Sequence, residues 1–158
     1  MKKRLIAPTP NSDSLTEPNW IDLEPIVEVE FSSEDSQYPV EGALRLAEQQ
    51  SGWRASIPGA QTLRLNFIAP LTLKRIHLRF VETHQPRTQE YVLRWSADNG
   101  HLFREIVRQQ WNFSPDGAAE EIENYTVELN GVTTLELYIV PDISGGTAVA
   151  TLAAWRIA

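Results

Sequence analysis

Ile76-His77-Leu78-Arg79-Phe80 and Tyr91-Val92-Leu93-Arg94-Trp95-Ser96 decide the fold class, because apolar and polar side chains alternate along both runs. An alternation with a period of two gives a strand one buried face and one exposed face. The polar residues 81–89 separate the two runs, and Asp98-Asn99-Gly100 follows the second one with the chemistry of a tight turn. Residues 76–100 therefore predict a hairpin of two strands with a polar bend between them.

The same alternation recurs on both sides of this stretch, at residues 27–33, 63–67, 71–80, 102–113, 125–129, 135–139 and 149–157. Turn sequences such as Pro58-Gly59 and Asn130-Gly131 separate the runs, and only residues 41–50 have a helical pattern. About eight strands without an alternation of strand and helix predict an all-β protein, an antiparallel β-sandwich of the jelly-roll type.

The length of 158 residues suits one domain with a sizeable core. Residues 1–25 carry prolines at positions 8, 10, 18 and 25 among polar residues, which predicts an extended N-terminal arm. Residues 26–158 then form the β-sandwich domain. No stretch of the sequence approaches the roughly 20 apolar residues that a membrane helix needs.

Composition narrows the partners and the compartment. A formal net charge of −7 argues against nucleic acid and anionic membranes, since both attract basic surfaces. The chain has no cysteine, which removes disulfides and cysteine-bound metals and is typical of a reducing compartment. Met1-Lys2-Lys3-Arg4-Leu5-Ile6 begins like a signal peptide, but Pro8 and Pro10 interrupt the apolar core that should follow. These features predict a cytoplasmic protein.

Sequence motifs of catalysis are missing: there is no Gly-x-Ser-x-Gly, no phosphate loop and no His-Glu-x-x-His. His77, His84 and His101 lie in separate segments and do not have the spacing of metal ligands. The sequence therefore predicts a protein that is not an enzyme.

Short motifs follow one another in an order typical of a known family. They are Tyr38-Pro39-Val40-Glu41-Gly42-Ala43-Leu44, then Trp53-Arg54-Ala55, Leu63-Arg64-Leu65-Asn66-Phe67 and Ser96-Ala97-Asp98-Asn99-Gly100. Over residues 27–158 the chain thus resembles the discoidin family, also called coagulation-factor type C domains, and its sugar-binding relatives. The resemblance implies a galactose-binding-like β-sandwich. Asn99 is an extra residue relative to the turn of the family.

The resemblance also implies where sugar-binding relatives hold a structural calcium ion, after the Ala43-Leu44 pair and near the C-terminus. Calcium needs several oxygen ligands, commonly carboxylates. Here Arg45-Leu46-Ala47 follows the pair, and the last strand reads Leu152-Ala153-Ala154-Trp155. We therefore expect this calcium site to be absent and expect no metal or other cofactor.

The resemblance further implies a ligand site at one tip, where three loops converge at about residues 34–41, 47–52 and 81–89. Planar polar side chains pair with sugar hydroxyls, and an aromatic ring covers the apolar face of a sugar. The expected ligand-binding residues are Tyr38, Gln49, His84 and Arg87. The alternative is that they are ordinary solvated loop residues. The expected function is a non-catalytic module that binds a carbohydrate or another small polar ligand.

A second expected function is docking of an intracellular protein partner through a sheet face. Five residues are candidates for that face: Arg75, His77 and Arg79 on one strand, with Arg108 and Trp111 on another. The competing interpretation is structural. The basic strip would pair with acids on neighbouring strands, for which Glu128 and Glu136 are available, and Trp111 would pack in the core.

Overall fold

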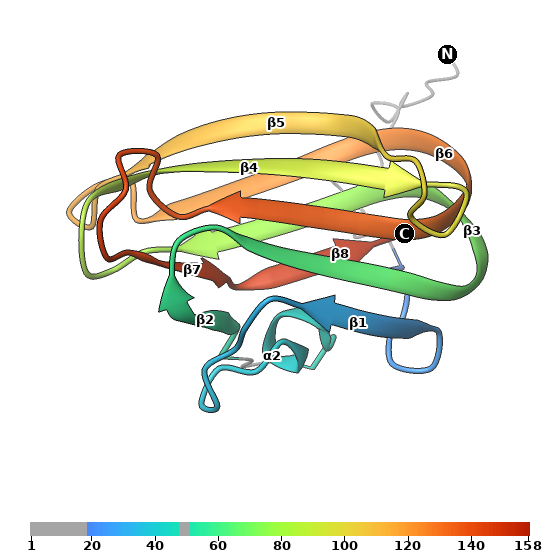
Figure 1. Cartoon of the computed structure of the whole chain (residues 1–158), viewed down its shortest axis with the longest axis horizontal. Helices are drawn as coiled ribbons and strands as arrows, with labels where there is room; N and C mark the ends of the chain where they lie inside the picture. The colour runs from blue at the N-terminus through green and yellow to red at the C-terminus, as the bar shows by residue number, and fades with distance from the viewer. Residues whose placement is uncertain (1–18, 48–50) are drawn as a thin grey trace, which may run out of the picture.

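Long antiparallel strands dominate the computed structural model, which describes residues 19–47 and 51–158 (Figure 1). The elements are β1 (Val27–Phe31), α2 (Glu41–Leu44), β2 (Trp53–Pro58), β3 (Gln61–Val81), β4 (Arg87–Ser96), β5 (Arg104–Phe113), β6 (Glu120–Val140), β7 (Val149–Leu152) and β8 (Ala154–Ile157). The predicted all-β, antiparallel β-sandwich is confirmed.

β3 and β6 are each 21 residues long and run through both layers of the sandwich. The first part of β3 pairs with the second part of β6 (Leu63 opposite Leu137), and the second part pairs with the first (Ile76 opposite Tyr125). Register shifts between Asn66 and Arg75 mark the bend, which is visible where β3 curls round at the right of Figure 1. The runs predicted as four separate strands are therefore two bent ones.

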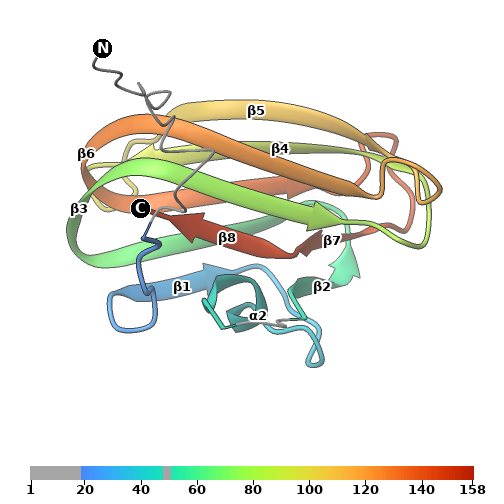
Figure 2. The same cartoon turned by 180° about the vertical axis from the view of Figure 1, so that it is seen from behind.

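One layer has the strand order β1-β3-β6-β4-β5, and β8 pairs with the second part of β3 in the other layer. Figure 2 shows β8 and β3 from behind, with β1 and α2 beneath them. The inward side chains of both layers form the core; among the fully buried ones are Leu63, Leu65, Leu78, Phe80, Leu93, Leu135, Leu137 and Trp155.

The hairpin predicted for residues 76–100 is wrong. The second part of β3 pairs with β6 and β8, whereas β4 pairs with β5 and β6, so residues 82–86 cross from one layer to the other. Phe80 and Tyr91 instead meet face to face across the core, with ring centroids 5.1 Å apart. The Asp98-Asn99-Gly100 turn does close a hairpin, but between β4 and β5, and Asn99 and Gly100 take positive φ angles of 60° and 83°.

β2 was not predicted, and it forms a small separate sheet with β7. The helix predicted for residues 41–50 is only α2, four residues long, and residues 48–50 lie outside the described part. Asn130-Gly131, predicted as a turn, lies inside β6, where Gly131 has a positive φ of 69° at the bend of the strand. Glycine takes this left-handed conformation without steric cost.

The arm predicted for residues 1–25 falls mostly outside the described part, which begins at Asn19. Trp20 lies against His77, and the Ile21 N–H donates to the Ile157 carbonyl at 2.8 Å. Leu23 belongs to the hydrophobic core. Packing on the sandwich therefore begins upstream of residue 26. No helix in the described ranges combines the length and the apolar character needed to cross a membrane.

Gly42 is a glycine whose lack of a side chain lets α2 approach the main chain at Gly52 closely. A Cβ atom at this position would lie 2.5 Å from the Gly52 carbonyl oxygen, which is main chain and cannot move away alone. We expect Gly42→Ala to lower the free energy of unfolding by about 1–3 kcal/mol, measured by urea denaturation. Gly117→Ala is the matched control, because a Cβ there meets nothing within 4 Å. Equal effects of the two substitutions would contradict the close-approach argument.

Candidate functional site

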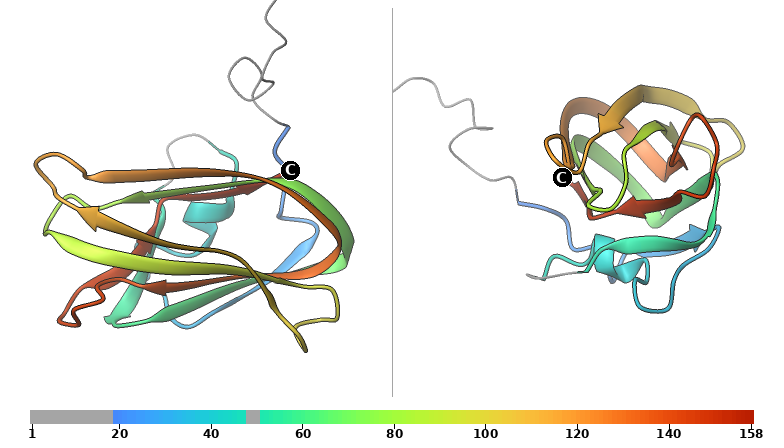
Figure 3. Two further views of the ribbon diagram at one scale, coloured as in Figure 1. Left: turned by 90° about the horizontal axis from the view of Figure 1, so that it is seen from above. Right: turned by 90° about the vertical axis from the view of Figure 1, so that its left-hand side faces the viewer.

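A cavity of about 230 Å³ opens at the end of the sandwich where residues 82–86 cross between the layers. This end lies at the left of Figure 1 and faces the viewer in the right-hand panel of Figure 3. Its polar lining includes Tyr38, Arg54, Glu82, His84, Gln85 and Thr151. Segments from four separate parts of the chain therefore meet in one cavity.

Two of the four expected ligand-binding residues, Tyr38 and His84, line this cavity. Gln49 lies outside the described residues. Arg87 does not line the cavity, because its side chain is buried behind it, and only 4% of the residue is exposed. The structure thus brings two of the expected side chains together and corrects the role of a third.

Arg87 is the best-connected polar side chain at this end of the molecule. Its guanidinium donates to Glu82 Oε1 at 2.7 Å, to the Pro141 carbonyl at 2.7 Å and to Thr151 Oγ1 at 3.3 Å. The same group lies 4.7 Å from the ring centroid of Phe113. A buried cation needs such partners, because burial without them is costly. Arg87 therefore holds the walls of the cavity in place from behind.

Glu82 anchors the exposed loop that carries His84. Its Oε1 atom receives the Arg87 hydrogen bond, and its Oε2 atom accepts from the main-chain N–H of His84 at 2.9 Å. Burial favours the neutral form of Glu82, but the hydrogen bonds from His84 and Arg87, with the charge of Arg87, outweigh it and lower the pKa. The loop is thus fixed by a carboxylate that stays ionised near neutral pH.

Tyr38 and Arg54 both line the cavity and contact each other. The Arg54 guanidinium lies 5.9 Å from the centroid of the Tyr38 ring, within the range of a cation–π contact. The Arg54 N–H also donates to the Tyr38 carbonyl at 3.1 Å, so the main chains of the two residues are joined. The cavity therefore offers an aromatic ring, planar donors and hydroxyl groups, a set that can pair with the hydroxyls of a small ligand.

The five residues expected to form one interaction face are spread over three surfaces. Arg79 forms an ion pair with Glu120 at 2.6 Å, and His77 forms a hydrogen bond with Asn124 at 2.7 Å and lies against Trp20. Arg75 lies half-buried on the same face of β3. The partners of Arg79 and His77 are therefore cross-strand neighbours in β6, an acid for Arg79 and an amide for His77, and neither partner is Glu128 or Glu136.

Arg108 and Trp111 lie on opposite faces of β5. Arg108 points outward and pairs with Glu90 at 2.6 Å and Glu105 at 3.2 Å. Trp111 is opposite the fully buried Gln89 and packs against the core. Residues three apart on a strand point to opposite sides, so these two cannot serve one contact surface. The expectation of a single interaction face is wrong.

A second polar cluster lies between the layers, along β4, β5 and β6. Gln89 Nε2 donates to Glu121 Oε1 at 3.3 Å, Gln109 Nε2 donates to Glu123 Oε1 at 3.4 Å, and the hydroxyls of Tyr91 and Tyr125 meet. Burial, with the nearby Glu123 carboxylate, raises the pKa of Glu121 to about 8. Sequence analysis missed this cluster, because Glu121 stands in a polar stretch after Pro115-Asp116-Gly117 and no local pattern indicates its burial.

Thr151 and Arg54 were also missed as cavity residues. The alternation of β2 and β7 predicts which side chains face inward, but only the pairing of these strands, with Arg54 opposite Thr151, brings them to the tip. No local signal in the sequence specifies that pairing, since the two residues are 97 positions apart.

No protein-family model and no curated protein matches the sequence. Solved structures do match it in three dimensions. The family 32 carbohydrate-binding module of Clostridium perfringens NanJ, solved with galactose, has a TM-score of 0.64 and 14% identity and covers 87% of this chain and 96% of its own. The Clostridium perfringens module CpGH89CBM32-5, solved with GalNAc-β-1,3-galactose, has a TM-score of 0.60 and 14% identity. The match covers 88% of this chain and 99% of that module.

A pectin-binding carbohydrate-binding module is similar as well, with a TM-score of 0.58, 18% identity and coverage of 84% of this chain and 89% of its own. At these identities the likeness is one of fold. The chain therefore has the β-sandwich fold of the family 32 carbohydrate-binding modules, the discoidin-like fold that the sequence motifs predicted.

The buried pair of Arg87 and Glu82 makes a stability prediction. Arg87→Met removes the cation and leaves the Glu82 carboxylate largely buried without its partner, which should lower the free energy of unfolding by about 3–5 kcal/mol. The double substitution Arg87→Met with Glu82→Gln should lose less, because no unpaired charge remains. Arg108→Met, at an exposed ion pair, should cost less than about 1 kcal/mol. Urea denaturation measures all three, and a loss for Arg87→Met as small as for Arg108→Met would contradict the supporting role.

Glu121 makes a prediction about pH. Its pKa is raised in the folded protein from 4.5 to about 8, so the folded state holds the proton more tightly than the unfolded state. The stability that this proton contributes is full below about pH 4.5 and is lost as the pH rises through about 8. We therefore expect Glu121→Gln to be more stable than the wild type at pH 9 and to differ less at pH 5.

Denaturant unfolding between pH 5 and pH 9 measures this difference. Glu128→Gln, at an exposed position of the same strand, is the matched control and should not change the pH profile. Parallel stability curves for wild type and Glu121→Gln would contradict the assigned titration.

Proposed function

We propose that this chain is a non-catalytic binding module that holds a carbohydrate, or another small hydroxylated ligand, in the tip cavity. The observation that carries the proposal is the convergence of Tyr38, Arg54 and His84 from separate segments on one cavity of about 230 Å³. These side chains offer an aromatic face with donors and acceptors around it, the set that sugar recognition uses. The fold adds support, because structures of this fold have been solved with galactose and with GalNAc-β-1,3-galactose.

The size of the cavity limits the ligand. Pockets for drug-sized molecules begin at about 300 Å³, so a cavity of about 230 Å³ suits a single sugar ring, with the rest of a longer glycan in solvent. The walls are held by Arg87 and Glu82 before any ligand arrives, which lowers the entropic cost of binding. We expect recognition of a terminal residue.

Binding without turnover fits the state of Glu82, the one carboxylate among the described residues that line the cavity. The pKa of Glu82 is lowered, and both of its oxygens are engaged by Arg87 and by the His84 main chain. A general acid needs a pKa near the working pH and a proton to give, which is the opposite of this arrangement.

The cytoplasmic location, argued from the lack of cysteine, is likewise a proposal, and cell fractionation tests it.

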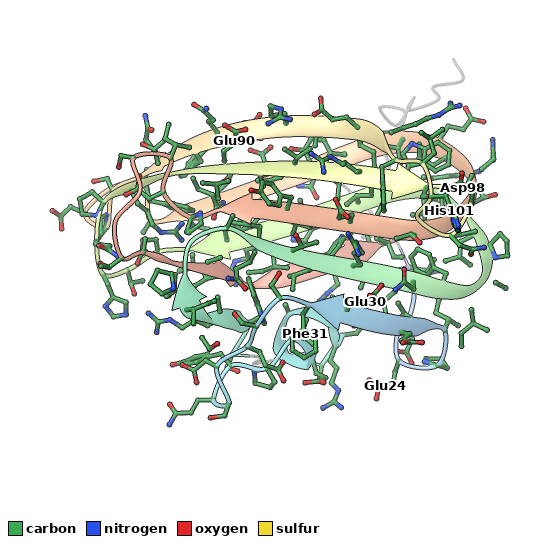
Figure 4. All side chains as sticks on the ribbon, viewed as in Figure 1. Glu24, Glu30, Phe31, Glu90, Asp98 and His101 are labelled. Atoms are coloured by element: carbon green, nitrogen blue, oxygen red, sulfur yellow. The ribbon has the colours of Figure 1, made fainter. Side chains whose placement is uncertain are left out.

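His84→Ala and Arg54→Ala test the site. Each removes a side chain that lines the cavity, so we expect each to weaken binding of the best hit from a glycan array by about tenfold or more, measured by isothermal titration calorimetry. His101→Ala is the matched control, because His101 lies at the other end of the sandwich, as Figure 4 shows. Thermal unfolding should show each variant folded.

Binding that survives both cavity substitutions would contradict the assigned site. A wild-type protein that binds nothing on a broad array would remove the carbohydrate from the proposal.

A further inference from the structure

The edge strand β1 and the short helix α2 enclose a groove that is separate from the tip cavity. The groove has a volume of about 250 Å³. Its apolar lining residues are Leu23, Val27, Val29, Phe31, Val40 and Leu44. Phe31 is 43% exposed, although it is a large aromatic residue. Part of the apolar face of β1 is therefore left open to a partner.

Acidic side chains surround this groove. Asp22, Glu24 and Glu41 line it, and Glu28 and Glu30 lie on the outer face of β1. Residues 19–47 contain seven carboxylates and a single cation, Arg45, which pairs with Glu24 at 3.3 Å in an exposed position. Figure 4 shows Glu24, Glu30 and Phe31 close together on this side of the molecule. A partner for the groove must therefore bring positive charge.

β1 also offers main-chain hydrogen-bonding groups. Within the described residues it pairs with β3 alone, so it is an edge strand. An extended peptide laid along such an edge satisfies the unpaired N–H and C=O groups, and its alternate side chains lie beside those of the edge strand. β1 has the sequence Val27-Glu28-Val29-Glu30-Phe31, in which apolar and acidic residues alternate. A complementary strand would therefore alternate apolar and basic residues.

We propose that β1 binds an extended segment of a partner protein in which apolar residues alternate with lysine or arginine. The apolar side chains of that segment lie beside Val27, Val29 and Phe31, on the side of the groove, while its cations lie beside Glu28 and Glu30. A second copy of this chain does not fit, because pairing β1 with β1 would place glutamates beside glutamates, and like charges on neighbouring strands repel. This surface is independent of the carbohydrate site.

A synthetic peptide tests the proposal. The probe is fluorescein-labelled Lys-Val-Lys-Val-Lys-Leu-amide, titrated with the full chain and followed by fluorescence anisotropy. The control peptide, Lys-Lys-Lys-Val-Val-Leu-amide, has the same composition and charge but no alternation. We expect saturable binding of the alternating peptide, at least about fivefold tighter than the control, because only it puts all its apolar residues on one face.

Protein variants separate charge from apolar contact. Glu28→Lys with Glu30→Lys should weaken binding by about tenfold or more, whereas Asp116→Lys with Glu128→Lys, which changes the net charge equally on other surfaces, should not. Phe31→Ser should weaken binding, and Ile122→Ser, which replaces an apolar residue of similar exposure (49%), should not. His84→Ala should leave peptide binding unchanged, so failure here and failure of the carbohydrate site are distinguishable.

Three results would overturn the proposal: no saturable binding, equal binding of the two peptides, or equal weakening by the two charge-reversing pairs. Analytical ultracentrifugation of the protein alone tests whether a second copy of the chain occupies the edge of β1. A dimer that Val29→Lys disperses would show that a second copy occupies the edge, and that result also overturns the proposal.

Discussion

The buried guanidinium of Arg87 is the interaction on which the tip of this sandwich depends. Residues 82–86 cross between the layers, so the crossing loop needs an attachment to both. Arg87 provides it by binding Glu82 at the start of the crossing, the Pro141 carbonyl at the end of β6 and Thr151 in β7. A buried charge tolerates few geometries, because each lost partner leaves a desolvated polar group. The same contacts of Arg87 therefore support both the crossing loop and the cavity wall.

Gln89 connects Arg87 to polar groups in the interior of the sandwich. This fully buried amide accepts from Arg87 at 3.3 Å and donates to Glu121, so it links the cation of the tip to the acidic cluster between the layers. The positive charge of Arg87 opposes the rise in the pKa of Glu121 that burial causes. A row of polar contacts thus runs through an otherwise apolar sandwich. Each buried polar group in this row has a hydrogen-bond partner in another segment, so a shift of one segment would leave several of them unpaired.

The sequence predicts the strands well and the connections between them poorly, for a physical reason. Alternation reports which face of a strand is buried, and it does so equally for a strand that stays in one layer and for one that bends into the next. The bends at residues 66–75 and at Gly131 therefore looked like gaps between strands. The family resemblance predicted the fold correctly, and two residues that it grouped at one tip, Tyr38 and His84, line the same cavity. It could not show that Arg87 faces inward, because that depends on Glu82 and Thr151.

Net charge is a weak guide to partners in this chain, because the charge is not spread evenly. Residues 19–47 contain seven of the 21 carboxylates with one cation, whereas residues 51–158 contain eleven carboxylates and ten cations and are nearly neutral. Among the described residues, the excess of negative charge therefore lies mainly on the side formed by β1 and α2. Salt limits the range of its electrostatic potential to about 10 Å at moderate ionic strength. Apart from Tyr38, the described residues named in the tip cavity come from the nearly neutral part. The tip cavity therefore offers mainly hydrogen-bonding groups and an aromatic ring, whereas the excess of negative charge lies on the β1 side.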